Sequence, residues 1–336
     1  MNQTKSNPPL DPMAVMRLSS AYWHSSVIHV AQQMDLFTRL ADGGKTANEL
    51  AKLCEADPRG IEMLTIACIG LGLVEKRGDQ FFNSALADTF LVKSSPRFQG
   101  GIVSMFDAWV PAWASLGEAV KKGMPVVEKQ HDKGPEQTRM YIMGMLYRGI
   151  PQAELLAAEL PLIDKNNLLD VAGGPGIFSI MFCKQNPQLS AKVLDLPQTL
   201  SITQEIIAQY HAEDKVSTQS GDYLSDDFGK SYDVVLLSSM INQEGPEVVR
   251  DIMAKSYRAM ESGGLLIVQE QLLNDQKTGP LLAVLIGLNQ LIHTPAGRVY
   301  NGQELAEIAT SVGFRQINYR ALPEPSPFTL LTAIKP

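Results

Sequence analysis

The feature that most constrains this chain is an apolar strand that runs into a glycine-rich turn. The run LLDVA at 168–172 is followed by GGPG at 173–176 and then by a helix-like segment, IFSIMFCKQN. Glycines in such a turn let the backbone approach a ligand without a Cβ in the way. The pattern predicts a strand–turn–helix unit whose turn contacts a ligand.

Three similar apolar runs follow, and helix-like segments separate them. They are AKVLDL at 191–196, YDVVLLSS at 232–239 and GLLIVQEQ at 264–271. Short leucine-rich or β-branched runs that alternate with helices are typical of a doubly wound parallel sheet. The sequence after about residue 164 therefore predicts an α/β domain of the Rossmann-like class.

The first hundred residues have a different pattern. Apolar residues recur at helical spacing over 14–40, Thr46 and Glu49 form a capping-box signature, and Pro58 opens another helix. The charged turn EKRGDQ then separates two short apolar pairs, as in a hairpin. This order predicts a winged helix, but Arg59 is the only basic residue of ADPRGIEMLTIACIGLGL. Dimerisation or a lid is therefore favoured over DNA reading.

These patterns predict three parts. They are a winged-helix dimerisation domain at 1–100, a helical linker lining an acceptor pocket at 101–163, and a Rossmann-like domain at 164–336. The linker is rich in aromatic and methionine side chains, which ordinary helix packing or an apolar ligand pocket would explain.

Charge and cysteine content narrow the possible partners. A net charge of -7 and a pI near 5.3 give no general positive field for phosphate backbones, so no nucleic-acid partner is expected. Cys54, Cys68 and Cys183 are far apart, which indicates reduced core thiols and no metal site. The beginning MNQTKSNPPLDP has no apolar stretch, and the apolar run at 280–292 is too short to span a bilayer. We therefore expect a cytoplasmic protein without a membrane partner.

Acidic residues after the strands predict a nucleoside site. Asp195 follows Asp170 by 25 residues at the end of the next strand, where a carboxylate accepts hydrogen bonds from ribose hydroxyls. Asp222 and Tyr223 would hold an adenine ring, although Asp222 also fits a turn cap. Because Pro175 removes a backbone N–H from the turn, a donor without phosphates, S-adenosylmethionine, is favoured over a dinucleotide.

The motifs DVAGGPG, VLDLP, GDY, YDVVLLSS, SGGLLIVQE and HTPAGR occur in this order. In order and spacing the chain resembles the S-adenosylmethionine-dependent small-molecule O-methyltransferases, such as caffeic acid and acetylserotonin O-methyltransferases. The resemblance covers about residues 13–335. It implies a homodimer formed through the N-terminal domain, a small-molecule acceptor and a C-terminal domain that binds S-adenosylmethionine.

The resemblance also implies roles for individual residues. The candidate cofactor-binding residues are Asp170, Gly173, Gly174, Gly176, Asp195, Leu196, Asp222, Tyr223 and Ser238. The candidate acceptor-pocket residues are Phe106, Trp109, Met145, Asn242 and His293. Glu270 falls on one of two glutamates that flank the family's catalytic histidine, and no metal is implied.

The sequence departs from the family at the catalytic base. Asn242 stands where the family has the histidine that removes the acceptor's proton, and Val299 stands where it has its second glutamate. An amide has no usable basic pKa and cannot act as a general base. Glu244 and His293 are possible replacements for the base, and Tyr300 or Tyr147 would only orient an acceptor. Asn242 and Glu270 remain as the candidate catalytic pair.

This departure favours an acceptor that is already nucleophilic at neutral pH. Such acceptors are an ionised acidic phenol, an amine, a thiolate or an activated ring carbon, methylated mainly by proximity. Two alternatives stay open: an enzyme that uses the sulfonium cofactor structurally for non-methylating chemistry, and a non-catalytic ligand-binding dimer.

Overall fold

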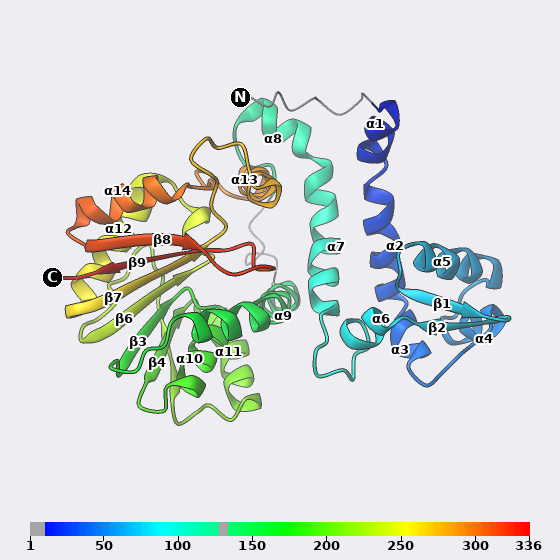
Figure 1. Cartoon of the computed structure of the whole chain (residues 1–336), viewed down its shortest axis with the longest axis horizontal. Helices are drawn as coiled ribbons and strands as arrows, with labels where there is room; N and C mark the ends of the chain where they lie inside the picture. The colour runs from blue at the N-terminus through cyan, green and yellow to red at the C-terminus, as the bar shows by residue number, and fades with distance from the viewer. Residues whose placement is uncertain (1–10, 128–133) are drawn as a thin grey trace, which may run out of the picture. The chain divides into compact units, whose positions relative to one another are not determined.

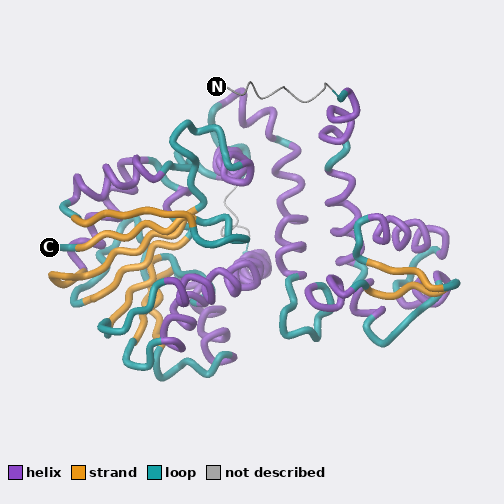
Figure 2. Tube along the Cα trace, in the orientation of Figure 1, coloured by secondary structure: helices purple, strands orange, loops and turns teal. Residues whose placement is uncertain are grey.

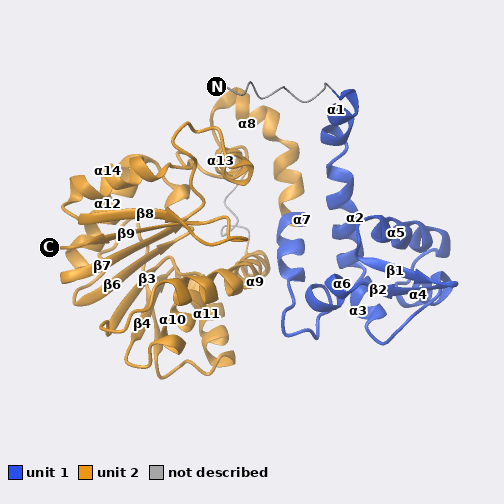
Figure 3. Cartoon of the chain, viewed as in Figure 1, with its two compact units in different colours: residues 1–107 blue, residues 108–336 orange. Residues whose placement is uncertain are grey.

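The computed structural model describes residues 11–127 and 134–336, so the first ten residues of the N-terminal sequence considered above lie outside the described residues. The chain divides into two compact units, unit 1 at Met1–Asp107 and unit 2 at Ala108–Pro336 (Figure 3). The division falls within one helix, α7 at Gly100–Ala114, whereas the sequence predicts parts that end at residues 100 and 163.

Unit 1 is a small helical domain with one hairpin, as predicted. Its elements are α1 (Pro12–Ser19), α2 (Tyr22–Gln33), α3 (Leu36–Leu40), α4 (Ala47–Leu53), α5 (Pro58–Gly70), β1 (Val74–Arg77), β2 (Gln80–Asn83) and α6 (Ala85–Phe90). Thr46 accepts the N–H of Glu49, whose carboxylate accepts the N–H of Thr46, so the predicted capping box is confirmed. The antiparallel β1 and β2 pack with the helices around a core that includes Phe37, Leu50 and Phe81.

Unit 2 contains a seven-stranded sheet in the order β5-β4-β3-β6-β7-β9-β8 (Figure 1). The strands are β3 (Asn167–Val171), β4 (Ser190–Asp195), β5 (Val216–Ser220), β6 (Tyr232–Ser238), β7 (Met260–Glu270), β8 (Arg315–Ala321) and β9 (Thr329–Ile334). The four predicted strands are confirmed, and β5 joins them in parallel. The parallel order ends at β9, which runs antiparallel to both β7 and β8.

Helices cover both faces of this sheet (Figure 2). They are α9 (Pro135–Glu159), α10 (Ile177–Gln185) and α11 (Pro197–Gln209) on one face, and α12 (Pro246–Ala259) and α14 (Gly302–Val312) on the other. Two further helices, α8 (Leu116–Lys122) and α13 (Leu281–His293), pack against each other in a separate small cluster, and a 3₁₀ turn spans Ile241–Gln243. Successive strand residues alternate between two cores: Leu168 packs with α9, α10 and α11, and Leu169 with α12 and α14. Because each face needs apolar side chains, the inner strands carry apolar residues at successive positions, as at Leu168–Leu169 of β3 and 234–237 of β6.

Three expectations concern the cysteines, metal ligands and membrane spans of the described residues. Cys68 and Cys183 are buried, whereas Cys54 is only partly buried and is not a core thiol. All three cysteines are free, and burial raises the pKa of Cys68 to about 11 and that of Cys183 to about 12, so both are unreactive core thiols. The described part of the chain holds no cluster of side chains suited to a metal ion. None of its helices combines the length and the apolar character that crossing a membrane requires.

Candidate functional site

A cavity of about 420 Å³ lies at the carboxyl ends of the central strands of unit 2. This is the edge at which parallel α/β sheets bind ligands. Eight of the nine candidate cofactor-binding residues line it: Asp170, Gly173, Gly174, Asp195, Leu196, Asp222, Tyr223 and Ser238. Gly176 instead caps the N-terminus of α10 with a left-handed φ of 72°. The sequence therefore identifies the acidic residues and most of the glycine turn in this wall, but not the residues that α9 contributes, such as Tyr141 and Arg148.

The glycine turn between β3 and α10 permits a close approach that a side chain would prevent. A Cβ on Gly173 would lie 2.6 Å from the Cγ of Asp170, and Gly174 has a φ of +54°. Ala172 also adopts a left-handed φ of 52°, which is uncommon for a residue with a Cβ. The turn thus packs closely over Asp170, which lines the cavity although it is only 1% exposed.

Asp170 is a buried carboxylate with one satisfied oxygen. Its Oδ2 accepts the Ser179 hydroxyl at 2.8 Å, while Oδ1 is buried without a hydrogen-bond partner. Burial raises the pKa of Asp170 to about 7, and the Ser179 hydroxyl opposes that rise. An unpaired carboxylate oxygen in a cavity is a suitable acceptor for a ligand ammonium group.

Asp195 is fixed by backbone donors at the end of β4. Its Oδ2 accepts the N–H of Gly174 at 2.8 Å and its Oδ1 accepts the N–H of Leu196 at 2.7 Å. Each carboxylate oxygen has a second lone pair, so the group can still accept hydrogen bonds from a diol. These contacts tie the glycine turn to the neighbouring strand and orient the carboxylate.

The loop after β5 carries Asp222 and Tyr223. Asp222 Oδ1 accepts the N–H of Leu224 at 2.9 Å, as expected for a residue that caps a turn. Asp222 also lines the cavity, as expected for a residue that contacts a ligand. Lys255 of α12 holds this loop, because its Nζ donates to the carbonyls of Tyr223 and Leu224 at 2.9 and 2.8 Å. Lys255 was not among the residues predicted from the sequence. The one feature of the sequence that could have indicated its role is its position on the buried face of an amphipathic helix.

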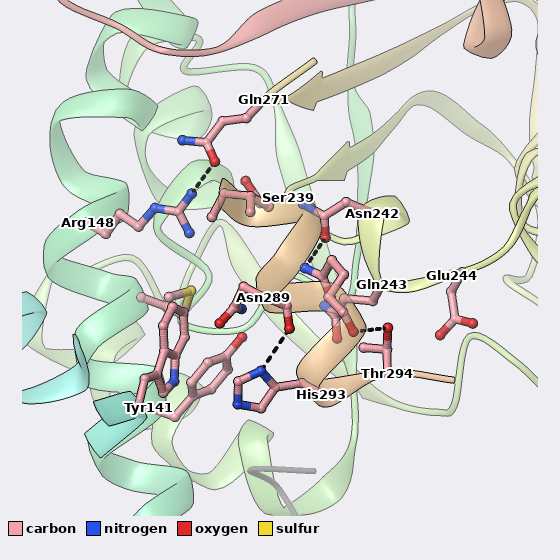
Figure 4. A pocket seen from close by; sticks show the side chains of 14 residues that line it. Tyr141, Arg148, Ser239, Asn242, Gln243, Glu244, Gln271, Asn289, His293 and Thr294 are labelled. Atoms are coloured by element: carbon pink, nitrogen blue, oxygen red, sulfur yellow. Dashed lines mark hydrogen bonds between the residues drawn. The ribbon is translucent and has the colours of Figure 1, made fainter. Parts of the chain in front are cut away.

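A second cavity adjoins the first and is shown in Figure 4. The two share five lining residues: Tyr141, Met145, Arg148, Ser239 and Gln243. Four of the candidate acceptor-pocket residues line the second cavity, namely Trp109, Met145, Asn242 and His293. Phe106 belongs to unit 1, where 43% of its surface is exposed, and does not line this cavity.

Asn242 is held on both sides in the wall of the second cavity. Its Nδ2 donates to Glu270 Oε2 at 2.9 Å, and its Oδ1 accepts from Gln290 Nε2 at 3.1 Å (Figure 4 shows the second contact). Glu270 Oε1 accepts the N–H of Ile241 at 3.1 Å. Burial raises the pKa of Glu270 to about 7, although these donors and the charge of Arg148 lower it. The candidate pair is therefore in contact, and Asn242 separates Glu270 from the cavity.

Glu244 and His293, the two residues considered as replacement bases, both line the second cavity, and each also makes another polar contact. Glu244 Oε1 accepts the Tyr223 hydroxyl at 2.8 Å, and the Tyr300 hydroxyl donates to the Glu244 carbonyl at 2.6 Å. His293 lines the second cavity, and its Nδ1 lies 2.9 Å from the Asn289 carbonyl oxygen. Tyr147 is not among the described residues that line either cavity. Both titratable candidates therefore lie at the second cavity, and Glu244 Oε1 and His293 Nδ1 are held by the contacts named above.

Arg148 is the functional candidate that the sequence analysis missed. It projects from α9 between the two cavities, and its guanidinium donates to Gln271 Oε1 at 3.3 Å (Figure 4). Burial lowers the pKa of Arg148, while Tyr141 and Glu270 raise it. An arginine inside an apolar, methionine-rich helix, in the sequence YIMGMLYRGI, is a signal that could have identified it.

Comparison with known protein families gives two matches. Residues 118–315 match the model of an O-methyltransferase domain. Residues 16–93 match the model of an O-methyltransferase dimerisation domain. The first match contains most residues that line the two cavities, apart from Trp109 and Phe328, and the second match lies within unit 1.

Similar proteins include enzymes that methylate aromatic natural products. The chain is 30% identical to a 3-hydroxy-5-methyl-1-naphthoate 3-O-methyltransferase of Streptomyces sahachiroi, over 96% of this chain and 95% of that protein. It is 28% identical to the N,N-dimethyltransferase OxyT of Streptomyces rimosus, over 98% and 99% of the two chains. The structure of human N-acetylserotonin methyltransferase in complex with SAM has the same fold, with a TM-score of 0.89, 20% identity, and coverage of 100% and 99%.

Proposed function

The chain belongs to the O-methyltransferase family, and we propose that it transfers a methyl group from S-adenosylmethionine to a small aromatic metabolite that is already nucleophilic. The family membership supports an S-adenosylmethionine-dependent methyltransferase. Named relatives methylate oxygen and nitrogen atoms, so membership alone leaves the acceptor atom open. The proposal concerns which acceptors this particular site serves.

The first cavity has the groups that S-adenosylmethionine requires. The unpaired oxygen of Asp170 would accept the ammonium group, and Asp195 would accept the ribose hydroxyls. Asp222 and Tyr223 would hold the adenine end. When bound, the cofactor supplies an electrophilic methyl group on a sulfonium, for which the protein supplies binding and orientation. The acceptor would occupy the second cavity, beside the shared residues.

The observation that carries the proposal is the position of Asn242 between Glu270 and Gln290. These contacts fix the amide so that Asn242 orients an acceptor in the cavity wall without removing its proton. A nucleophile that needs no base requires only alignment with the methyl group, and positioning alone contributes several kcal/mol. An acidic phenol, an amine, a thiolate or an activated ring carbon meets this condition.

The proposal predicts how turnover depends on the acceptor's own acidity. For a series of phenols at fixed pH, kcat/KM should fall by up to about tenfold for each unit by which the phenol pKa exceeds the pH, because only the ionised form reacts while the more basic phenolates are better nucleophiles. S-adenosylhomocysteine formation, measured by mass spectrometry, gives the rate. A rate independent of phenol pKa would show that a base acts and would overturn the proposal.

Two variants of Asn242 make this test sharper. Asn242→Ala should lower kcat/KM modestly and keep the same dependence on phenol pKa, because it removes orientation alone. Asn242→His introduces a base beside Glu270 and should weaken that dependence. Product that forms without stoichiometric S-adenosylhomocysteine would instead support the structural-cofactor alternative.

A further inference from the structure

The charged groups where the two cavities meet affect which acceptors can bind there. Arg148 is one of the five residues that line both cavities, so its guanidinium lies where donor and acceptor meet. The guanidinium has five N–H donors, and Gln271 Oε1 is its one hydrogen-bond acceptor among the described residues. Most of its donor capacity therefore remains available to a ligand.

The charge of Glu270 acts on Arg148, but the Glu270 carboxylate makes no hydrogen bond to the guanidinium. Both oxygens of Glu270 accept from other groups, Asn242 Nδ2 and the N–H of Ile241, and Glu270 is only 2% exposed and lines neither cavity. Among the described residues, the other side chains that interact with Arg148 are neutral: Tyr141, Gln271 and the ring of Phe328, whose centroid lies 5.5 Å from the guanidinium carbon. Asp170, Asp195 and Asp222 line the first cavity together with Arg148, and Glu244 lines the second. The positive charge of Arg148 thus faces the cavities.

The sulfonium of S-adenosylmethionine would bring a second positive charge to the site. With a neutral acceptor, only the carboxylates that line the first cavity and the cofactor's own carboxylate would offset these charges, in a partly desolvated space where charge interactions are stronger than in water. An acceptor with an anionic oxygen offsets both charges. A planar carboxylate or phenolate also matches the fork of a guanidinium.

We infer that Arg148 is a specificity-determining residue that binds an anionic oxygen of the aromatic acceptor, a ring carboxylate or a phenolate. The inference rests on the proposed methyl-transfer function, because it takes the second cavity as the acceptor site. It extends that function by naming the substrate class: aromatic acceptors that enter as anions. Gln271 is a positioning residue, since it orients the guanidinium.

Binding to the full-length protein saturated with S-adenosylhomocysteine tests this inference by calorimetry. The first pair of probes is 3-hydroxy-2-naphthoate and 3-hydroxy-2-naphthamide, which have nearly the same shape and differ in charge. The second pair is 4-nitrophenolate, measured above its own pKa, and 4-nitroanisole. We expect the anion of at least one pair to bind about tenfold or more tightly than its neutral partner, the range of a charge-assisted hydrogen bond. The pair that shows the preference identifies the anion as carboxylate or phenolate.

Three variants separate charge recognition from structural damage. Arg148→Gln should abolish the preference while leaving the affinity of the neutral probe within about twofold. Arg148→Lys keeps the positive charge but lacks the planar, forked guanidinium, so it should retain part of the preference for the anion. Arg139→Gln is the matched control, because Arg139 lies on the same helix, is exposed and pairs with Glu205; it should behave as the wild type.

Each result decides a different question. If the wild-type protein does not bind S-adenosylhomocysteine, the proposed function itself is contradicted. Normal cofactor binding with equal affinity for anion and neutral probe in both pairs, or with no binding of any probe, would overturn the role of Arg148 and leave the function standing. A preference that persists in Arg148→Gln would likewise overturn it.

Discussion

At the scale of single residues, two buried carboxyl groups have the same direction of pKa shift in different surroundings. Asp170 and Glu270 both have a pKa raised to about 7 by burial. Glu270 is enclosed by hydrogen-bond donors and lines neither cavity, whereas Asp170 presents an unpaired oxygen at the cofactor cavity. Only Asp170 is therefore available to compensate a charge on a ligand.

This difference predicts a pH dependence of cofactor binding. The ammonium group of S-adenosylhomocysteine requires ionised Asp170, so the affinity should fall below about pH 7, by at most about tenfold per pH unit. Asp170→Asn should bind weakly with little pH dependence. The control is Asp275→Asn, since Asp275 is an exposed loop residue. If calorimetric titration gives the same affinity at pH 5 and at pH 8, two values on either side of about pH 7, the assignment of Asp170 to the ammonium group is contradicted.

The raised pKa of Asp170 also predicts how the stability of the ligand-free protein depends on pH, and this dependence runs opposite to that of cofactor binding. A carboxyl whose pKa is raised in the folded state contributes stability below its unfolded pKa of about 4, and this is lost as the pH rises through about 7. The free energy of unfolding of the ligand-free protein should therefore decline over this interval. Asp170→Asn should make the decline smaller, as measured by urea denaturation at several pH values, and an unchanged decline would show that Asp170 is already ionised.

At the scale of elements, one helix fixes the loop that holds the adenine end. Lys255 of α12 is 7% exposed and donates to two carbonyls of the loop after β5. Lys255→Met should weaken S-adenosylhomocysteine binding about tenfold and lower the free energy of unfolding by about 1–3 kcal/mol, because both carbonyls lose a charged donor. Lys230→Met, at an exposed position before β6, should change neither quantity. Wild-type affinity in Lys255→Met would show that the loop needs no such support.

The elements also show which parts of the structure are readable in the sequence. Runs such as LLDVA and YDVVLLSS are recognisable because both faces of an inner strand are buried, while β5 and β8 are edge strands whose exposed side chains give no apolar run. The glycine turn and Asp195 have characteristic spacing. Arg148, Lys255 and Gln290 do not, because their roles depend on contacts between segments far apart in the chain. The cofactor cavity was thus predictable, and the charge of the acceptor cavity was not.

At the scale of the whole molecule, the dimerisation-domain match agrees with an exposed apolar surface on unit 1. In α1 and α2, Val15, Leu18, Tyr22 and Trp23 are between 61% and 79% exposed. Monomeric proteins rarely expose several large apolar side chains together, so we expect this surface to be covered by a second copy of the chain. Among the residues that the structure describes, in contrast, those that line the two cavities all belong to unit 2.

This separation predicts that assembly and cofactor binding can be uncoupled. The double variant Leu18→Asp/Trp23→Asp should sediment as a monomer where the wild type sediments as a dimer, because two carboxylates would have to be buried in the interface. It should keep the wild-type affinity for S-adenosylhomocysteine. Leu53→Asp, at a leucine of α4 that is 42% exposed, is the matched control and should remain dimeric. A double variant that stays dimeric would place the interface elsewhere, and one that loses the cofactor would show that dimerisation shapes the site in unit 2.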